Sequence, residues 1–109
     1  MPDRLEFLQG TLDMLVLRTL QWGPNHGHGI AQTIRTNSNE LLQVETGSLY
    51  PALHRLEKKG LLQAEWREVN GREAKFYSLT KAGTRQLEDE QENWHRLAGA
   101  VGMILRTVE

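Results

Sequence analysis

The chain has 109 residues, no cysteine and a formal net charge of −1 at pH 7. Its length and composition suit one globular domain, and the lack of cysteine excludes disulfides, thiolate metal sites and thiol nucleophiles. The longest apolar run, residues 14–17, is far shorter than the roughly 20 residues of a membrane-spanning helix, and residues 1–4 do not lead into a signal-peptide core. We therefore expect a cytoplasmic protein that makes no contact with a membrane.

The small net charge hides an uneven distribution along the sequence. Residues 1–45 hold three basic and five acidic side chains, residues 46–80 hold six and four, and residues 81–109 hold four and five. Only the middle segment is positive, and there the basic residues alternate with aromatic ones. A bias of this size fits a solvated surface as well as a nucleic-acid-binding patch, so charge alone leaves both interpretations open.

Hydrophobic spacing predicts two helices in the first part of the chain. Thr11 can cap a helix that is apolar around most of its circumference and stops at Trp22-Gly23-Pro24, as a buried central helix would. Leu5 and Leu8 extend its spacing towards the N-terminus, which predicts a short amphipathic arm able to contact another chain. After a glycine- and histidine-rich loop, a shorter helix is predicted over residues 29–37.

A third helix is predicted between residues 46 and 59. Three leucines at helical spacing form its apolar face, and Lys58-Lys59-Gly60 ends it with basic charge and a glycine in the left-handed conformation. Pro51 is awkward in a helix unless it falls in the first turn, so we place the start near Ser48.

The hydrophobic period then changes from that of a helix to that of a strand. Residues 62–67 alternate between apolar and polar, and a second such run follows at 74–79. The intervening Asn70-Gly71 is a strong hairpin signal, so we expect a two-stranded ribbon. Trp66 falls on the apolar side of its strand, which predicts that it is buried in the core.

A long final helix is predicted after Thr80, which can cap it. An apolar seam at heptad spacing runs along this helix, through Leu87, Trp94, Leu97, Val101, Ile104 and Val108. One small core cannot cover a seam of this length. We therefore expect the helix to pair with a second copy of the chain.

This order of elements predicts an α+β fold, mostly α, of the winged helix-turn-helix class. In such a fold the third helix, residues 46–59, enters the DNA major groove, and the ribbon, residues 62–79, lies on the backbone or in the minor groove. Residues 1–80 would form the DNA-binding part with its N-terminal arm, and residues 81–109 a dimerisation helix of the same domain. Polar residues outside the leucine face are candidates for base and phosphate contacts: Ser48, Tyr50, His54, Arg55, Lys58 and Lys59, with Arg67, Arg72 and Lys75 on the ribbon.

Several motifs together resemble those of the PadR-like transcriptional regulators. They are TGSLYPAL at residues 46–53, RLEKKGLL at 55–62 and KFYSLTKAG at 75–83, with GTL at 10–12 and GHGI at 27–30. The resemblance extends from about Leu8 to near the end of the chain. It implies a winged-helix homodimer, usually a bacterial repressor, whose last helix pairs with its partner and with the first helix.

The resemblance also implies roles for individual residues. DNA contacts are expected at Thr46, Ser48, Tyr50, His54, Arg55, Arg72 and Lys75. The dimer interface is expected at Leu12, Leu87, Trp94, Leu97, Val101, Ile104 and Val108. Some PadR-like proteins bind flat aromatic compounds at the interface, so Trp94 either forms half of a stacking slot for a small aromatic effector or only fills the interface.

Other functions remain open at this stage. His26 and His28 could bind a metal, but no third ligand has a recognisable spacing, so we expect no metal, no cofactor and no enzymatic activity. Gly27 and Gly29 lack the lysine and hydroxyl of a phosphate-binding loop. The same fold can also serve as a protein-interaction or RNA-binding module, since fold does not fix function.

Overall fold

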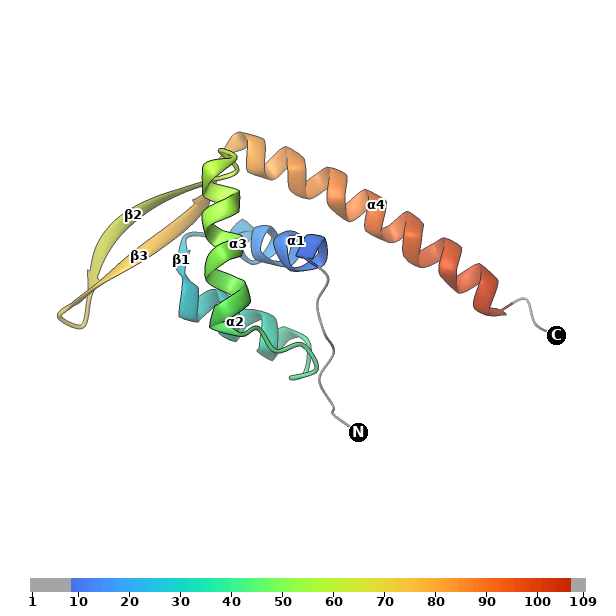
Figure 1. Ribbon diagram of the computed structural model, residues 1–109, viewed down its shortest axis with the longest axis horizontal. Coiled ribbons are helices and arrows are strands. Elements are labelled where there is room, and N and C mark those ends of the chain that lie inside the picture. Colours follow the sequence, from blue (N-terminus) through green and yellow to red (C-terminus); the bar gives the residue numbers. More distant parts are fainter. Residues whose placement is uncertain (1–8, 107–109) are drawn as a thin grey trace.

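The computed structural model describes residues 9–106, and it has the mostly helical α+β architecture that the sequence predicts. The elements in chain order are α1 (Gln9–Thr19), the 3₁₀ helix η1 (Leu20–Trp22), β1 (Asn25–His26), α2 (Gly27–Asn37), α3 (Thr46–Lys58), β2 (Leu62–Val69), β3 (Arg72–Leu79) and α4 (Lys81–Arg106). Helices α1 to α3 form a bundle from which the β2-β3 hairpin and α4 extend in opposite directions (Figure 1). The predicted arm at Leu5 and Leu8 and the seam residue Val108 lie outside the described residues. None of the helices in residues 9–106 is long and apolar enough to cross a bilayer.

The hydrophobic core is centred on α1, as its apolar circumference predicts. Val16 and Leu17 are fully buried there, and they join buried side chains from the other helices: Ile30, Leu49, Leu53, Leu56 and Leu87. Two residues expected at the dimer interface belong to this core, because α4 still packs on α1 along its first turns. Leu12 is 3% exposed and Leu87 is 0% exposed, so neither side chain is available to a second copy of the chain.

Helix α2 begins at Gly27 and helix α3 at Thr46, each two residues before its predicted start. The imidazole Nδ1 of His26 accepts a hydrogen bond from the Gly29 amide at 3.1 Å, which caps α2 and lets it begin at Gly27. Helix α3 begins at Thr46 and contains Pro51 in its interior. Proline removes only the hydrogen bond to the carbonyl of Gly47, an exposed residue, so the first turns of the helix tolerate it.

The far ends of these elements follow the predicted signals closely. Gly60 has a φ of 78°, and the amides of Gly60 and Leu61 donate to the carbonyls of Glu57 and Leu56, which closes α3 in a Schellman motif. The Thr80 hydroxyl accepts from the Gly83 amide at 3.0 Å, so Thr80 caps α4 as expected.

The hairpin turns at Asn70 and Gly71, whose φ values of 52° and 78° suit the tight turn predicted there. The sheet has three strands in the order β1-β3-β2, because Asn25 and His26 pair with β3. A strand of two residues has no periodicity, so the sequence did not reveal it. The expectation for Trp66 was wrong: it is 64% exposed, because only the base of the hairpin reaches the core.

Candidate nucleic-acid interface

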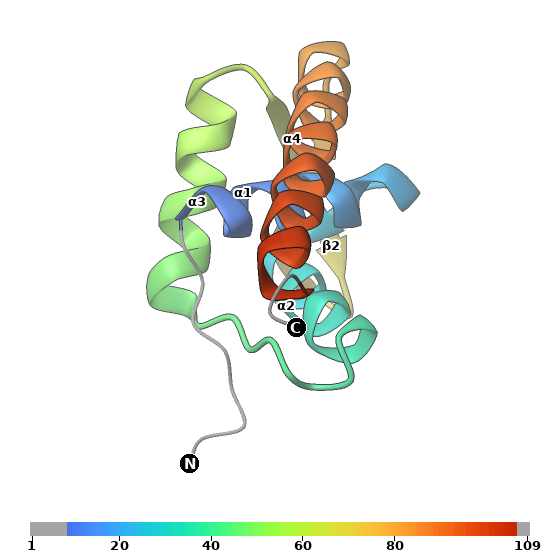
Figure 2. The same ribbon diagram turned by 90° about the vertical axis from the view of Figure 1, so that its right-hand side faces the viewer.

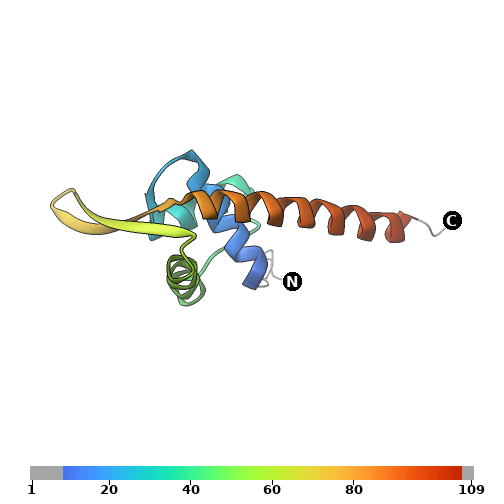
Figure 3. The ribbon, with the colours of Figure 1, turned by 90° about the horizontal axis from the view of Figure 1, so that it is seen from above.

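The outer face of α3 carries the polar residues that the sequence assigns to DNA recognition. Thr46, Ser48, Tyr50 and His54 are exposed, while the leucines of the opposite face are buried. Figure 2 shows α3 at one side of the molecule, and Figure 3 shows it below the line formed by the hairpin and α4. Within residues 9–106 no other element covers this side of α3, so its polar face is accessible to a large ligand.

Tyr50 is held at the junction between α2 and α3. Its ring lies so close to Gly27 that a Cβ atom there would be 2.9 Å from the ring and from the hydroxyl oxygen. Glycine at this position therefore lets the aromatic ring rest against the first turn of α2. The tyrosine is in this way positioned from two helices, with part of its ring in solvent.

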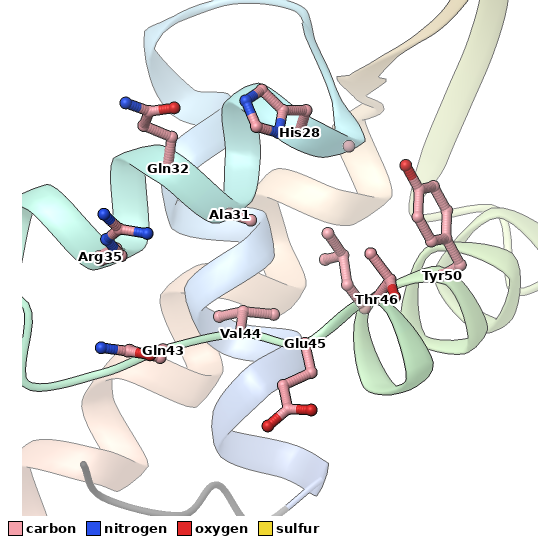
Figure 4. Close-up of a pocket in the computed structure, with 11 residues that line it drawn as sticks. His28, Ala31, Gln32, Arg35, Gln43, Val44, Glu45, Thr46 and Tyr50 are labelled. Carbon is pink, nitrogen blue, oxygen red and sulfur yellow. The ribbon is translucent and has the colours of Figure 1, made fainter.

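A groove of about 230 Å³ opens between α2 and the start of α3. Figure 4 shows His28, Gln32 and Arg35 along its α2 side, across from Thr46 and Tyr50 on α3, with the side chain of Gln32 pointing away from α3. None of these three α2 residues was among the DNA contacts expected from the sequence, where His28 was considered only as a metal ligand. Their spacing places them on one side of a short helix, but only the packing of α2 beside the start of α3 shows that they line the groove.

Arg55 differs from the rest of the predicted set, because its side chain turns towards the protein. Its Nη2 donates to Oδ1 of Asp13 at 2.8 Å, and this ion pair ties α3 to α1. Asp13 is 8% exposed as a residue, so the carboxylate that engages Arg55 lies at the edge of the core. The pair gives Arg55 a structural partner where the resemblance implies a DNA contact.

The two basic residues expected on the hairpin lie on opposite faces of it. Side chains alternate along a strand, so Arg72 and Lys75, three positions apart on β3, project to different sides. Arg72 is exposed beside the hairpin tip. Lys75 reaches back to α3, where its Nζ donates to Oε1 of Glu57 at 3.2 Å. This hydrogen bond raises the pKa of Lys75 and keeps its ammonium charged beside the recognition helix.

One of the two histidines at the start of α2 has a structural role. His26 caps the helix, and its ring packs edge-on against Phe76 with the centroids 5.2 Å apart. The structure brings no group of three histidine or acidic side chains together as a metal site within residues 9–106.

The distal part of α4 presents an apolar stripe to solvent. Trp94, Leu97, Val101 and Ile104 are all exposed there, on the part of the helix that runs beyond the bundle (Figure 1). At the root of the stripe, Trp94 and Leu97 border a cavity of about 420 Å³ against α1. These four residues are the part of the predicted dimer seam that is exposed to solvent in the protomer.

The helix bundle, the exposed helix α3 and the adjoining hairpin define a winged helix-turn-helix DNA-binding protein. The model of the Transcriptional regulator PadR-like family matches residues 16–89. The chain belongs to this family, as its motifs predicted, and it is a DNA-binding transcriptional regulator and not an enzyme.

Similar proteins agree with this membership over most of the chain. The transcriptional regulator Rv3488 of Mycobacterium tuberculosis is 34% identical over 96 residues, which are 88% of this chain and 87% of the relative. A PadR family transcriptional regulator from Eggerthella lenta has a solved structure with a TM-score of 0.79 and 35% identity, covering 91% of this chain and 85% of that one. A transcriptional regulator from Clostridium thermocellum superposes with a TM-score of 0.82 at 26% identity, covering 93% and 96% of the two chains.

Proposed function

We propose that this protein is a cytoplasmic repressor that binds a specific, near-palindromic DNA sequence as a homodimer. The observation that carries the proposal is that one protomer exposes both a polar recognition helix and, on α4, an apolar stripe whose side chains face solvent. Paired through their α4 helices, two protomers would place their α3 helices in successive major grooves, about 34 Å apart.

The contacts divide by their chemistry. Thr46, Ser48, Tyr50 and His54 would face base edges and the adjacent backbone from α3, since short polar and aromatic side chains suit the major groove. Arg72 and Lys75 would bind phosphates from the two faces of the hairpin, and the α2 side of the groove would meet a further phosphate. Arg55 is left to its pair with Asp13.

Dimer formation would also compensate for the small number of unpaired basic residues on one protomer. The chain has 13 basic and 14 acidic residues, so long-range attraction to DNA is weak, and Arg55 and Lys75 already have acidic partners. The two α3 helices of one dimer would bind the same duplex together, because the second contact becomes intramolecular once the first has formed.

Selection of bound sequences from a random duplex pool, repeated at two salt concentrations, tests the proposal. We expect one palindromic motif to be enriched, with an affinity that falls steeply as salt rises, by a slope of about −0.9 per phosphate neutralised. Enrichment of no motif, together with a flat salt response, would favour the protein-interaction module. Preferential binding of an RNA pool would favour the RNA-binding module.

We further propose that a flat aromatic effector binds at the root of α4. Trp94 borders the cavity of about 420 Å³ there. If a two-fold axis passes near this point, the two Trp94 rings of the dimer would lie on either side of it and could stack on a flat ligand between them. A ligand wedged between the long helices would change the separation of the two α3 helices and so the affinity for a site of fixed spacing.

Fluorescence provides the test for the effector. In a variant with Trp22→Phe and Trp66→Phe, Trp94 is the one remaining tryptophan, and we expect a planar probe such as proflavine to quench it saturably. In the otherwise native chain, Trp94→Ala should abolish binding of the probe, whereas Trp22→Ala should leave it intact. Equal binding of the probe by the Trp94→Ala variant would show that Trp94 only fills the interface.

A further inference from the structure

Trp66 is a large aromatic side chain in an unusual place. It is 64% exposed on strand β2, outside the helix bundle, and it belongs neither to the core nor to the apolar stripe of α4. An exposed indole places a large apolar area in water, which is unfavourable. Covering that area on binding is favourable, so tryptophan is often a main contact residue of binding surfaces.

The register of the hairpin shows which way Trp66 points. Trp66 lies directly opposite Lys75, and alternation places both on the hairpin face that becomes buried at its base through Leu62 and Tyr77. Lys75 reaches Glu57 on α3 from this face. Trp66 therefore lies on the α3 side of the hairpin, and Figure 1 shows the hairpin running away from α3 at an angle.

This angle is where a bound duplex would pass. With α3 in the major groove and the hairpin over the neighbouring backbone, the sugar-phosphate strand between the two grooves runs between α3 and the hairpin. Deoxyribose offers an apolar edge and phosphate an acceptor oxygen. The indole has a flat apolar face and one N–H donor, so it matches both groups at once.

The next cross-strand pair on the same face is unfavourable for contact with phosphate. Glu68 and Glu73 lie directly opposite each other, one step beyond Trp66 and Lys75 towards the tip. Two adjacent carboxylates repel phosphates. Contact with the backbone along this face is thereby limited to the level of Trp66 and Lys75.

We propose that Trp66 is a DNA-contacting residue whose indole packs on a deoxyribose of the strand between the grooves and whose Nε1–H donates to a phosphate. The contact reads no base, so it contributes affinity for all duplexes alike. The proposal rests on the proposed binding of double-stranded DNA and adds to it an uncharged anchor that sequence reasoning had assigned to the core.

Titration of a labelled, mixed-sequence duplex of about 30 base pairs tests this contact directly. We expect Trp66→Ala to weaken binding about tenfold, with an unchanged slope of affinity against salt because no cation is lost. Trp22→Ala is the matched control, since Trp22 is equally exposed at 64% on η1, and its affinity should equal that of the native chain. Thermal unfolding of each variant checks that the fold is retained.

A second measurement leaves Trp66 in place and does not depend on the folding of the Trp66→Ala variant. In a variant with Trp22→Phe and Trp94→Phe, Trp66 is the one tryptophan left. We expect the bound duplex to shield the fluorescence of Trp66 from quenching by iodide. Glu68→Gln with Glu73→Gln should strengthen binding of the same duplex.

The outcomes separate this proposal from the proposed function. Native affinity in Trp66→Ala and unaltered iodide quenching, in a protein that does bind the duplex, would overturn the role of Trp66 and leave DNA binding standing. A native chain that binds no duplex would overturn the DNA-binding proposal and the role of Trp66 together.

Discussion

Val101→Asp is expected to convert the protein from a dimer to a monomer and to weaken binding of its selected duplex about 100-fold. Val101 is 46% exposed in the middle of the α4 stripe, between Leu97 and Ile104. A carboxylate there would be removed from water on pairing without a compensating partner, which opposes association of the α4 helices. A monomer has one α3 helix for each molecule, so it loses the gain in affinity that two linked α3 helices provide.

Met103→Asp is the matched control for this experiment. Met103 is also exposed and apolar, but it lies on the side of α4 opposite to Trp94 and Val101, a little over half a turn along the helix from Val101. We expect it to remain a dimer with native affinity. Sedimentation equilibrium at micromolar concentration gives the mass, and the duplex titration gives the affinity. An unchanged mass and affinity in Val101→Asp would exclude the apolar stripe as the dimer interface.

Asp13→Ala should lower the free energy of unfolding by about 3 kcal/mol. The side chain of Asp13 is 11% exposed and that of Arg55 is 31% exposed, so removing the carboxylate leaves the guanidinium partly desolvated without its acidic partner. The link between α1 and the recognition helix is lost with it. Urea denaturation at one fixed protein concentration measures the change, because association also contributes to apparent stability.

Two further variants separate the ion pair from general effects of substitution. Adding Arg55→Met to Asp13→Ala removes the uncompensated charge and should restore most of the stability. Glu65→Ala breaks the exposed pair with Arg67, 2.7 Å long, and should cost no more than about 1 kcal/mol. If Arg55→Ala leaves stability unchanged and alters the preferred base at one position of the site, Arg55 contacts DNA and the pair with Asp13 does not hold it.

The parts of the fold that were predictable are those with strong local signals. Asn70-Gly71 specifies its turn through two residues that adopt positive φ readily, and Thr80 caps α4 through a hydroxyl three residues from the amide it satisfies. Gly60 ends α3 for a similar local reason. Such features depend on neighbours in the sequence, and the sequence displays them directly.

The features that the sequence did not reveal depend on contacts between distant segments. Strand β1 exists only because Asn25 and His26 meet β3 about fifty residues later. Arg55 has a polar helical position that equally suits a DNA phosphate, and only the placement of Asp13 on α1 turns it inwards. Trp66 alternates like a core residue, but its exposure depends on how far the hairpin extends beyond the bundle.

The candidate site shows the same division. The exposed residues of α3 follow from the leucine spacing, since burying one face of a helix leaves the other to solvent. The α2 side of the groove, with His28, Gln32 and Arg35, could not be assigned without knowing that α2 packs beside the start of α3. The opposite orientations of Arg72 and Lys75 follow from the start of β3 at Arg72, two residues ahead of the predicted strand.

The close approach of Tyr50 to Gly27 has a consequence for sequence variation among related chains. A methyl group at position 27 would occupy the space of the tyrosine ring, so the ring would have to move away from α2. Positions 27 and 50 are therefore expected to co-vary: chains that carry a larger residue at the first should carry a smaller one at the second. A glycine that has no side chain of its own to contact DNA would in this way constrain which aromatic residue the polar face of α3 can display.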